Sequence, residues 1–230
     1  MASTRKKRTD APRTARARKA AAPRRKATEL SLRRTPMQAR GLATFDGILD
    51  ATAALLEQVG GEGLTTNLIA RAAQVNVATL YQYFPNKQAV LLELFRRQSD
   101  RLIQMSDARL QGLHRSADWR RVIASLIQDV AEARESTPGT TALRQLMRSS
   151  PDLLAHEQTY AKHMAATLAQ ELRDAGVKRE QAMLVARSTI EALTALLDWW
   201  QIGTGGRDKA IVAEAKAMVT NYLAPHLGRK

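Results

Sequence analysis

Three helix start signals follow one another closely between residues 64 and 91, and they strongly limit how this chain can fold. Thr65, Asn76 and Asn86 are all of the residue types that cap the N-terminal ends of helices. Caps at these intervals leave room for two short helices, a tight turn at Gln74 between them, and the start of a longer helix. This arrangement predicts a helix-turn-helix, in which the second helix enters the major groove of DNA.

The remainder of the chain also predicts helices, and no segment shows the alternating pattern of a strand. A cap followed by proline at Thr35-Pro36 starts a helix, which Gly60-Gly61 ends. The fold class is therefore all-α, with an N-terminal helix-turn-helix domain and a helical domain after it. Further helices are predicted over residues 86–110, 116–137, 141–147, 151–175, 179–202 and 208–223, with the glycine-rich run 203–206 as the turn before the last.

Positive charge is concentrated at the N-terminal end. Residues 1–37 carry 13 Lys and Arg residues and two acidic residues, and so supply +11 of the formal net charge of +14. The first 34 residues contain too few apolar side chains to form a core, so we expect residues 1–34 to be a disordered basic arm. Such an arm either serves only solubility or lies along DNA phosphates or in the minor groove.

Several kinds of site are not expected. The chain has no cysteine, which excludes disulfides and thiolate metal sites, and no apolar run long enough to span a membrane, so we expect a cytoplasmic protein. His156-Glu157 begins like a zinc-protease motif, but Tyr160 stands where the second histidine ligand belongs. No acid, base and nucleophile set is apparent among the scattered histidines. We therefore predict no catalytic residues, no metal and no cofactor.

The run LTTNLIARAAQVNVATLYQYFPNKQAVL at residues 64–91 resembles the DNA-binding domain of the TetR (tetracycline repressor) family of bacterial transcriptional regulators. The resemblance covers residues 35–95 and implies that residues 96–230 form a helical ligand-binding and dimerisation domain. One residue departs from the family pattern, because the family usually has glycine where this chain has Gln74. We expect the turn to be kept at some cost, since glycine adopts left-handed backbone conformations more readily.

The outward face of the second short helix supplies candidate contacts to bases. Gln82 can pair with adenine N6 and N7, and Val77 can touch a thymine methyl group. The resemblance implies that Thr66, Tyr81, Tyr83 and Lys87 hold phosphates, although the tyrosines could instead be half-buried packing residues. The predicted DNA-binding residues are Thr65, Thr66, Val77, Ala78, Thr79, Tyr81, Gln82, Tyr83 and Lys87.

Methionine, aromatic and histidine side chains of the later helices could line an apolar pocket for a small molecule. Each of them could equally fill the core, because apolar residues at helical spacing usually serve packing. The candidate ligand-binding residues are Met105, Trp119, Leu126, Met147, Tyr160, His163, Met164 and Trp199.

The resemblance implies a homodimer that binds a double-stranded DNA operator, in which the helices at 179–202 and 208–223 form a four-helix bundle with their partners. We expect the stripe Ile190, Leu193 and Leu197 to lie in this contact. The implied function is transcriptional regulation, as a repressor that an unidentified small molecule releases from its operator. The alternatives are a nucleoid-type protein that binds DNA through the arm regardless of sequence, and an enzyme in the helical domain.

Overall fold

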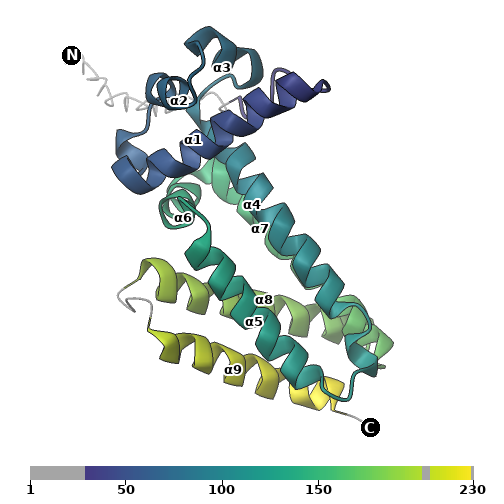
Figure 1. Cartoon of the computed structure of the whole chain (residues 1–230). Coiled ribbons are helices and arrows are strands. Elements are labelled where there is room, and N and C mark those ends of the chain that lie inside the picture. Colours follow the sequence, from purple (N-terminus) through teal and green to yellow (C-terminus); the bar gives the residue numbers. More distant parts are fainter. Residues whose placement is uncertain (1–28, 204–207, 229–230) are drawn as a thin grey trace, which may run out of the picture.

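The computed structural model describes residues 29–203 and 208–228, which form two helical lobes joined by one long helix (Figure 1). The small lobe contains α1 (Ala39–Gly63), α2 (Thr66–Ala72) and α3 (Val77–Tyr83). The long helix α4 (Lys87–Leu110) leads from it into the large lobe. The large lobe contains a short 3-10 turn (Leu113–Arg115) and the helices α5 (Trp119–Ser136), α6 (Thr140–Ser149), α7 (Pro151–Asp174), α8 (Arg179–Ile202) and α9 (Lys209–Leu227).

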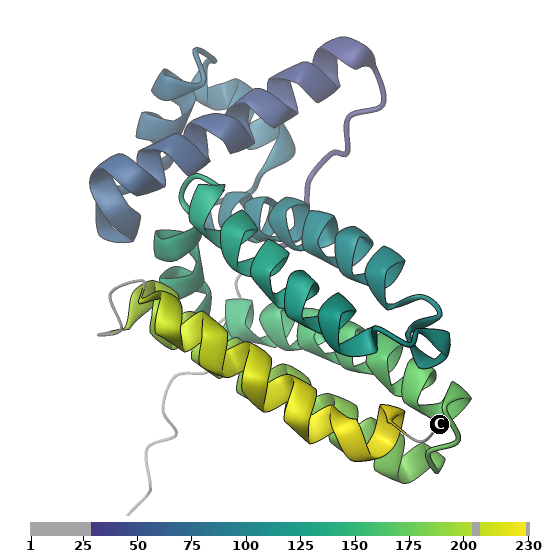
Figure 2. The same ribbon diagram turned by 60° about the horizontal axis from the view of Figure 1, so that its bottom comes forward.

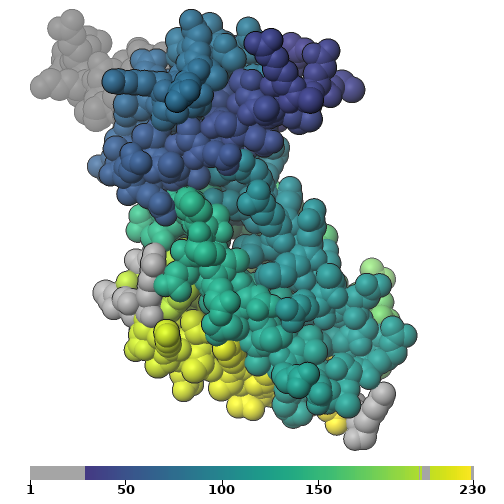
Figure 3. Space-filling view, viewed as in Figure 1, coloured from purple at the N-terminus to yellow at the C-terminus, as the bar shows by residue number. Residues whose placement is uncertain are grey.

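These elements confirm the all-α prediction, since the described residues contain helices and no strand. The space-filling view shows the small lobe seated on one end of the large lobe (Figure 3). Among the described residues, no helix is both long enough and apolar enough to cross a membrane.

The small lobe has its own aromatic and aliphatic core. Phe45 of α1 stacks on Phe84, the residue after α3, with ring centroids 4.9 Å apart. Ile69 of α2 and Leu80 of α3 are fully buried beside them. Because helices as short as α2 and α3 are marginal alone, this burial against α1 is what holds them in place.

The three predicted caps are confirmed by their hydrogen bonds. The Thr65 hydroxyl accepts from the N–H of Leu68 at 3.2 Å. The Asn76 and Asn86 side chains accept from the N–H groups of Ala78 at 2.8 Å and Ala89 at 2.9 Å. Each cap satisfies a backbone donor that the first turn of a helix leaves free.

Gln74 adopts the left-handed conformation that the turn requires, with φ of 55°. The N–H of Val75 donates to the carbonyl of Ala70 at 2.9 Å, and the N–H of Gln74 donates to that of Arg71 at 3.1 Å. This pair of bonds is the Schellman ending of a helix, in which glycine is the usual left-handed residue. The turn is therefore kept, with a residue that is strained there.

Replacing Gln74 with glycine is expected to stabilise the protein by up to about 1 kcal/mol. Glycine removes the strain of a left-handed side-chain-bearing residue, and the greater entropy of the unfolded chain offsets part of the gain. Urea denaturation followed by circular dichroism measures the change. Gln82→Gly, in the exposed interior of α3, is the control and should lose about 1 kcal/mol. A loss of stability in Gln74→Gly would contradict the strain argument.

Some helix ends differ from the sequence expectation. The first helix begins at Ala39 and not at Pro36, and α9 continues beyond residue 223 to Leu227. Pro225 lies inside the last turn of α9, where its missing N–H leaves one carbonyl of the preceding turn without a helical hydrogen bond. The cap of α5 is Asp118 instead of Ser116. Residues 204–206 of the predicted glycine turn lie outside the described residues.

The large lobe is built around α8, which packs against both α7 and α9, while α5 packs across α9 (Figure 2). Trp119 and Leu126 of α5 and Trp200 of α8 are buried in this core. A carboxylate also holds the α4–α5 connection, since Glu171 accepts from the N–H of Gly112 at 2.9 Å and from His114 Nδ1 at 2.7 Å.

Helix α6 joins the two lobes, although it lies far along the chain from the small lobe. Its Leu143 and Met147 are fully buried in the same core as α1. At the start of α6, Gly139 has φ of 71°, and a Cβ there would lie 2.6 Å from the carbonyl oxygen of Ala53 in α1. Only glycine allows this close approach, so α6 is packed directly on the small lobe.

Candidate nucleic-acid interface and ligand cavity

The outer face of α3 carries side chains suited to DNA. Ala78, Tyr81 and Gln82 are exposed, whereas Val77 and Thr79 are half-buried. Val77 packs partly against the small-lobe core, so only part of its side chain remains for a thymine methyl contact. Gln82 is therefore the exposed side chain on this face best able to read a base edge by paired hydrogen bonds.

Thr66 and Tyr81 lie together between α2 and α3. The Thr66 hydroxyl and the Tyr81 hydroxyl are 3.1 Å apart and hydrogen-bonded. When one hydroxyl donates to the other, the second hydroxyl keeps its own hydrogen, which can be donated to a phosphate oxygen. Thr65, also exposed, uses its hydroxyl oxygen as the α2 cap, which leaves its O–H free to donate.

Lys87 and Tyr83 are less available than the sequence suggests. The Lys87 ammonium lies 2.9 Å from the carbonyl oxygen of Leu64 and 3.5 Å from that of Gly61, so part of its donor capacity is used within the protein. Tyr83 is 9% exposed and packs edge-on against Phe45 at 5.7 Å. Since a phosphate contact needs an accessible hydroxyl, we omit Tyr83 from the proposed contacts.

The last residues of the predicted arm are ordered against the DNA-binding lobe. Arg33 donates through its backbone N–H to the carbonyl of Tyr83 at 2.9 Å and through its guanidinium to that of Tyr81 at 3.2 Å. Asn86 donates to the carbonyl of Glu29 at 2.7 Å, and Leu30 packs against the core. The predicted disorder therefore does not extend to residues 29–34, and residues 1–28 lie outside the described residues. Leu30 and Leu32, which pack against the core, anchor this otherwise charged segment.

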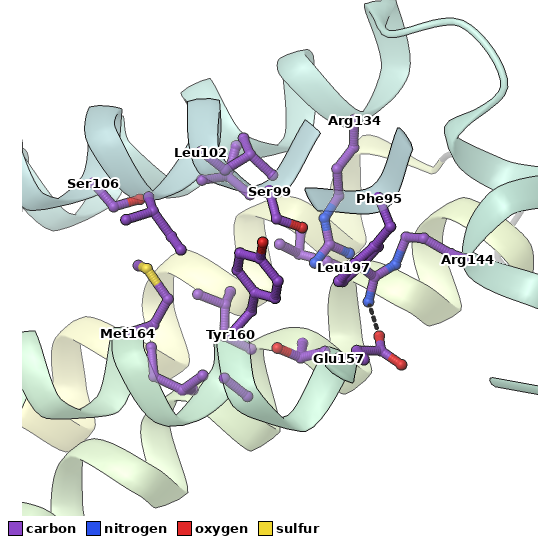
Figure 4. A pocket seen from close by; sticks show the side chains of 16 residues that line it. Phe95, Ser99, Leu102, Ser106, Arg134, Arg144, Glu157, Tyr160, Met164 and Leu197 are labelled. Carbon is purple, nitrogen blue, oxygen red and sulfur yellow. Dashed lines mark hydrogen bonds and ion pairs between the residues drawn. The ribbon is translucent and has the colours of Figure 1, made fainter. Parts of the chain in front are cut away.

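A cavity opens inside the large lobe, with about 710 Å³ of empty space including its mouth. Side chains from α4, α5, α6, α7 and α8 line it, as Figure 4 shows. Its largely apolar wall, with a few charged side chains, is typical of a small-molecule site.

Two of the eight predicted ligand-binding residues, Tyr160 and Met164, line this cavity. The other six are elsewhere, because their helical spacing reflected packing or surface position. Trp119, Leu126 and Met147 are buried in the cores, and Met105 packs against the large-lobe core. His163 lies on the surface, 3.1 Å from an Asp107 oxygen, and Trp199 is 50% exposed on the outside of α8.

A buried charge cluster closes one end of the cavity, and the sequence analysis did not identify it. Asp198 of α8 is 2% exposed and accepts from Arg134 of α5 at 3.0 Å and from Arg144 of α6 at 2.8 Å. Arg148 of α6 also pairs with Asp198, and Glu157 of α7 pairs with Arg144 at 2.8 Å. Residues 54 and 64 positions apart meet here, so no local pattern announces the cluster.

The prediction that the apolar stripe of Ile190, Leu193 and Leu197 on α8 forms the dimer contact is wrong. Ile190, Leu193 and Leu197 line the internal cavity, and Leu197 is 1% exposed. The outward side of the same helix carries Leu184 at 67% and Trp199 at 50% exposure. This helix has apolar residues on both sides, so periodicity alone could not tell which side faces outward. Among the described side chains of α8 and α9, Met183, Met218 and Tyr222 are also large, apolar and exposed.

Comparison with known proteins agrees with this architecture. Residues 48–94 match the sequence model of the bacterial regulatory proteins of the tetR family, and residues 118–223 match that of the tetracyclin repressor-like C-terminal domain. The transcriptional regulator BetI of Cronobacter sakazakii is 25% identical over 183 residues, which are 78% of this chain and 89% of BetI. The transcriptional repressor KstR of Rhodococcus jostii is 42% identical over 55 residues, 24% of this chain and 26% of KstR.

Solved structures show the same fold. The crystal structure of a TetR-family regulator from Streptomyces coelicolor superimposes with a TM-score of 0.61 at 22% identity, over 80% of this chain and 99% of that one. The fold, the capped helix-turn-helix and both halves of the sequence thus lead to one conclusion. This chain belongs to the TetR family, and it is a DNA-binding transcriptional regulator.

Proposed function

We propose that this regulator is a homodimeric repressor that leaves its operator when a small molecule fills the cavity of the large lobe. The observation that carries this proposal is the double role of α6. Arg144 of α6 lines the cavity, while Leu143 and Met147 of the same helix are buried in the core of the small lobe. A ligand that displaces Arg144 therefore acts on a helix packed against the DNA-binding lobe.

The ligand shifts the protein between two arrangements of its DNA-binding lobes only by its difference in affinity for them. Because protein interiors are close-packed, a displacement of α6 cannot be absorbed locally at Gly139, where a Cβ would lie only 2.6 Å from the carbonyl oxygen of Ala53 in α1. In a dimer, a tilt of each small lobe changes the separation of the two copies of α3, and the operator half-sites lie at fixed spacing.

The exposed apolar side of α8 and α9 is the proposed contact between the two copies. Leu184, Trp199 and Tyr222 are exposed there by 67%, 50% and 43%. Several large apolar side chains exposed on two neighbouring helices are more typical of a protein–protein interface than of a surface in contact with water. Relatives whose names describe repressors, such as KstR, favour repression over activation, and such a regulator acts in the cytoplasm, where the DNA is.

The operator itself provides the direct test. Footprinting of the DNA upstream of the gene for this protein should reveal a two-fold symmetric site that purified protein protects. Sequence-independent protection would instead support the nucleoid-type alternative. Turnover of compounds that bind the cavity would support the enzyme alternative, for which the relatives, named as transcriptional regulators, give no precedent.

Gln82→Ala is expected to weaken binding to the operator by about 1–3 kcal/mol and to relax base preference at one position in each half-site. The reason is the exposed carboxamide on the outer face of α3. Fluorescence anisotropy on a panel of single-base operator variants measures it. Tyr81→Phe is the matched control, because loss of a phosphate-contacting hydroxyl should weaken every operator similarly. Unchanged discrimination in Gln82→Ala would leave Val77 and Thr79 as the readers.

Deletion of residues 1–28 is expected to weaken DNA binding and to reduce its salt dependence. Each lost phosphate contact should lower the slope of log affinity against log salt by about 0.9. We propose that the arm reaches DNA because its anchored end, at Arg33, lies on the C-terminal end of α3. Anisotropy over a range of salt concentrations measures the slope. An unchanged slope, with an unchanged melting temperature, would show that the arm serves only solubility.

A further inference from the structure

The cavity of the large lobe has two chemically different ends (Figure 4). Arg134, Arg144 and Glu157 lie together at one end. Met164 lies toward the other end in Figure 4, and the half-buried Leu193 is a further aliphatic side chain of the wall. A molecule that fills this cavity must therefore be amphipathic, with a polar head among the charged groups and an apolar body beyond it.

Two buried polar atoms at the charged end have no hydrogen-bond partner within the described part of the protein. One is Nε of Arg134, a donor, and the other is Oε2 of Glu157, an acceptor. Their own side chains are otherwise engaged, since Arg134 donates to Asp198 and Glu157 accepts from Arg144. Buried groups left unpaired are costly, so a ligand that supplies an acceptor to Arg134 and a donor to Glu157 gains both bonds.

The balance of charge at this end favours a negative head group. Among the described residues, the ion pairs of this cluster join three guanidinium groups, those of Arg134, Arg144 and Arg148, to two carboxylates, those of Glu157 and Asp198. Burial, and then repulsion from Arg144, lower the pKa of Arg134 to about 9 in spite of its attraction to Asp198. The positive charge on Arg134 is therefore incompletely compensated, and a nearby anion would stabilise it.

We propose that the effector is an amphipathic organic acid whose carboxylate binds Arg134 and whose adjacent hydroxyl or amide N–H donates to Glu157. Its apolar body lies along the side of the cavity that contains Met164 and Leu193. This inference rests on the proposed function, because it names the chemical class of ligand for the same cavity. Arginine suits this role, since its planar guanidinium donates several hydrogen bonds toward a carboxylate.

A matched set of ten-carbon probes tests the head group on the full-length dimer without DNA. Isothermal titration calorimetry with decanoate, 3-hydroxydecanoate, decanol and decyltrimethylammonium compares charge and donor at constant tail length. Decanoate should bind about ten-fold or more tightly than decanol, and 3-hydroxydecanoate more tightly again. Equal binding of acid and alcohol, or preference for the ammonium compound, would overturn the proposal. Equal binding of the two acids would overturn the donor to Glu157.

Two substitutions place the ligand within the cavity. Arg134→Gln should remove the preference for decanoate over decanol, whereas Arg109→Gln, in an exposed pair with Asp129 outside the cavity, should keep it. Leu193→Phe narrows the apolar side and should shift the preference toward shorter acids. If Arg134→Gln does not fold, the probe series on the unaltered protein still tests the head group, and Leu193→Phe still tests where the apolar body lies. Folded Arg134→Gln with unchanged preference would contradict the proposed contact.

The readouts separate this inference from the proposed function. Calorimetry reports ligand binding whether or not the protein recognises an operator. Operator release is measured separately, by anisotropy with labelled DNA and increasing 3-hydroxydecanoate. Acid binding without release would uphold the ligand class and contradict ligand-released repression. Release by a cationic or neutral compound, with no binding of acids, would contradict the ligand class and uphold ligand-released repression.

Discussion

Glutamate at both Leu184 and Trp199 is expected to convert the proposed dimer to a monomer and to weaken operator binding by about 10²–10⁴-fold. Both side chains project from the outer side of α8, with 67% and 50% of their surfaces exposed. Two carboxylates in each copy would face each other in a desolvated contact, which costs far more than the lost apolar burial. A monomer holds a single half-site and loses the avidity of two linked recognition helices. Sedimentation velocity gives the oligomeric state, and anisotropy the affinity.

Two single substitutions make the controls for this result. Val59→Glu introduces the same charge at a residue of similar exposure, 44%, on α1, and should leave a dimer. Leu193→Glu places the charge on the cavity side of α8 and should lower stability before it changes the oligomeric state. A double variant that remains a dimer with full operator affinity would place the interface elsewhere than on the outer side of α8.

Asp198→Asn is expected to lower the free energy of unfolding by about 3–5 kcal/mol. Asp198 is 2% exposed and is the shared acceptor of Arg134, Arg144 and Arg148. A neutral amide of the same shape leaves these guanidinium groups with Glu157 as the remaining carboxylate of the cluster, in a site that water reaches poorly. Urea denaturation followed by circular dichroism, at a fixed protein concentration, measures the loss.

Asp129→Asn is the matched control for this substitution. Asp129 pairs with Arg109 at 2.7 Å on the surface, between α5 and α4, where solvent screens the interaction. Its loss should cost less than about 1 kcal/mol. If Asp198→Asn were no more destabilising than Asp129→Asn, the buried cluster would not stabilise the large lobe. Ligand binding would then be its remaining role.

The local structure of the DNA-binding lobe could be predicted from the sequence because its signals are local. Thr65, Asn76 and Asn86 each cap the helix that follows within three residues, as their hydrogen bonds confirm. Gln74 adopts the left-handed conformation of the turn although glycine would do so with less strain. A cap or a turn depends on neighbouring residues, so the amino-acid sequence is sufficient to locate it.

The cavity and the proposed partner surface could not be located in that way. Periodicity identified α8 as a helix, but its apolar residues occupy more than one side, and only packing against α7 and α9 turned Leu193 inward and Leu184 outward. The same packing brought Arg134 to Asp198 across 64 positions of sequence. The sequence by itself determined that the chain is helical, the three caps at Thr65, Asn76 and Asn86, and the helix-turn-helix. Only the tertiary structure decided which side chains of different large-lobe helices meet. These contacts join residues far apart in the sequence, so no local pattern predicts them.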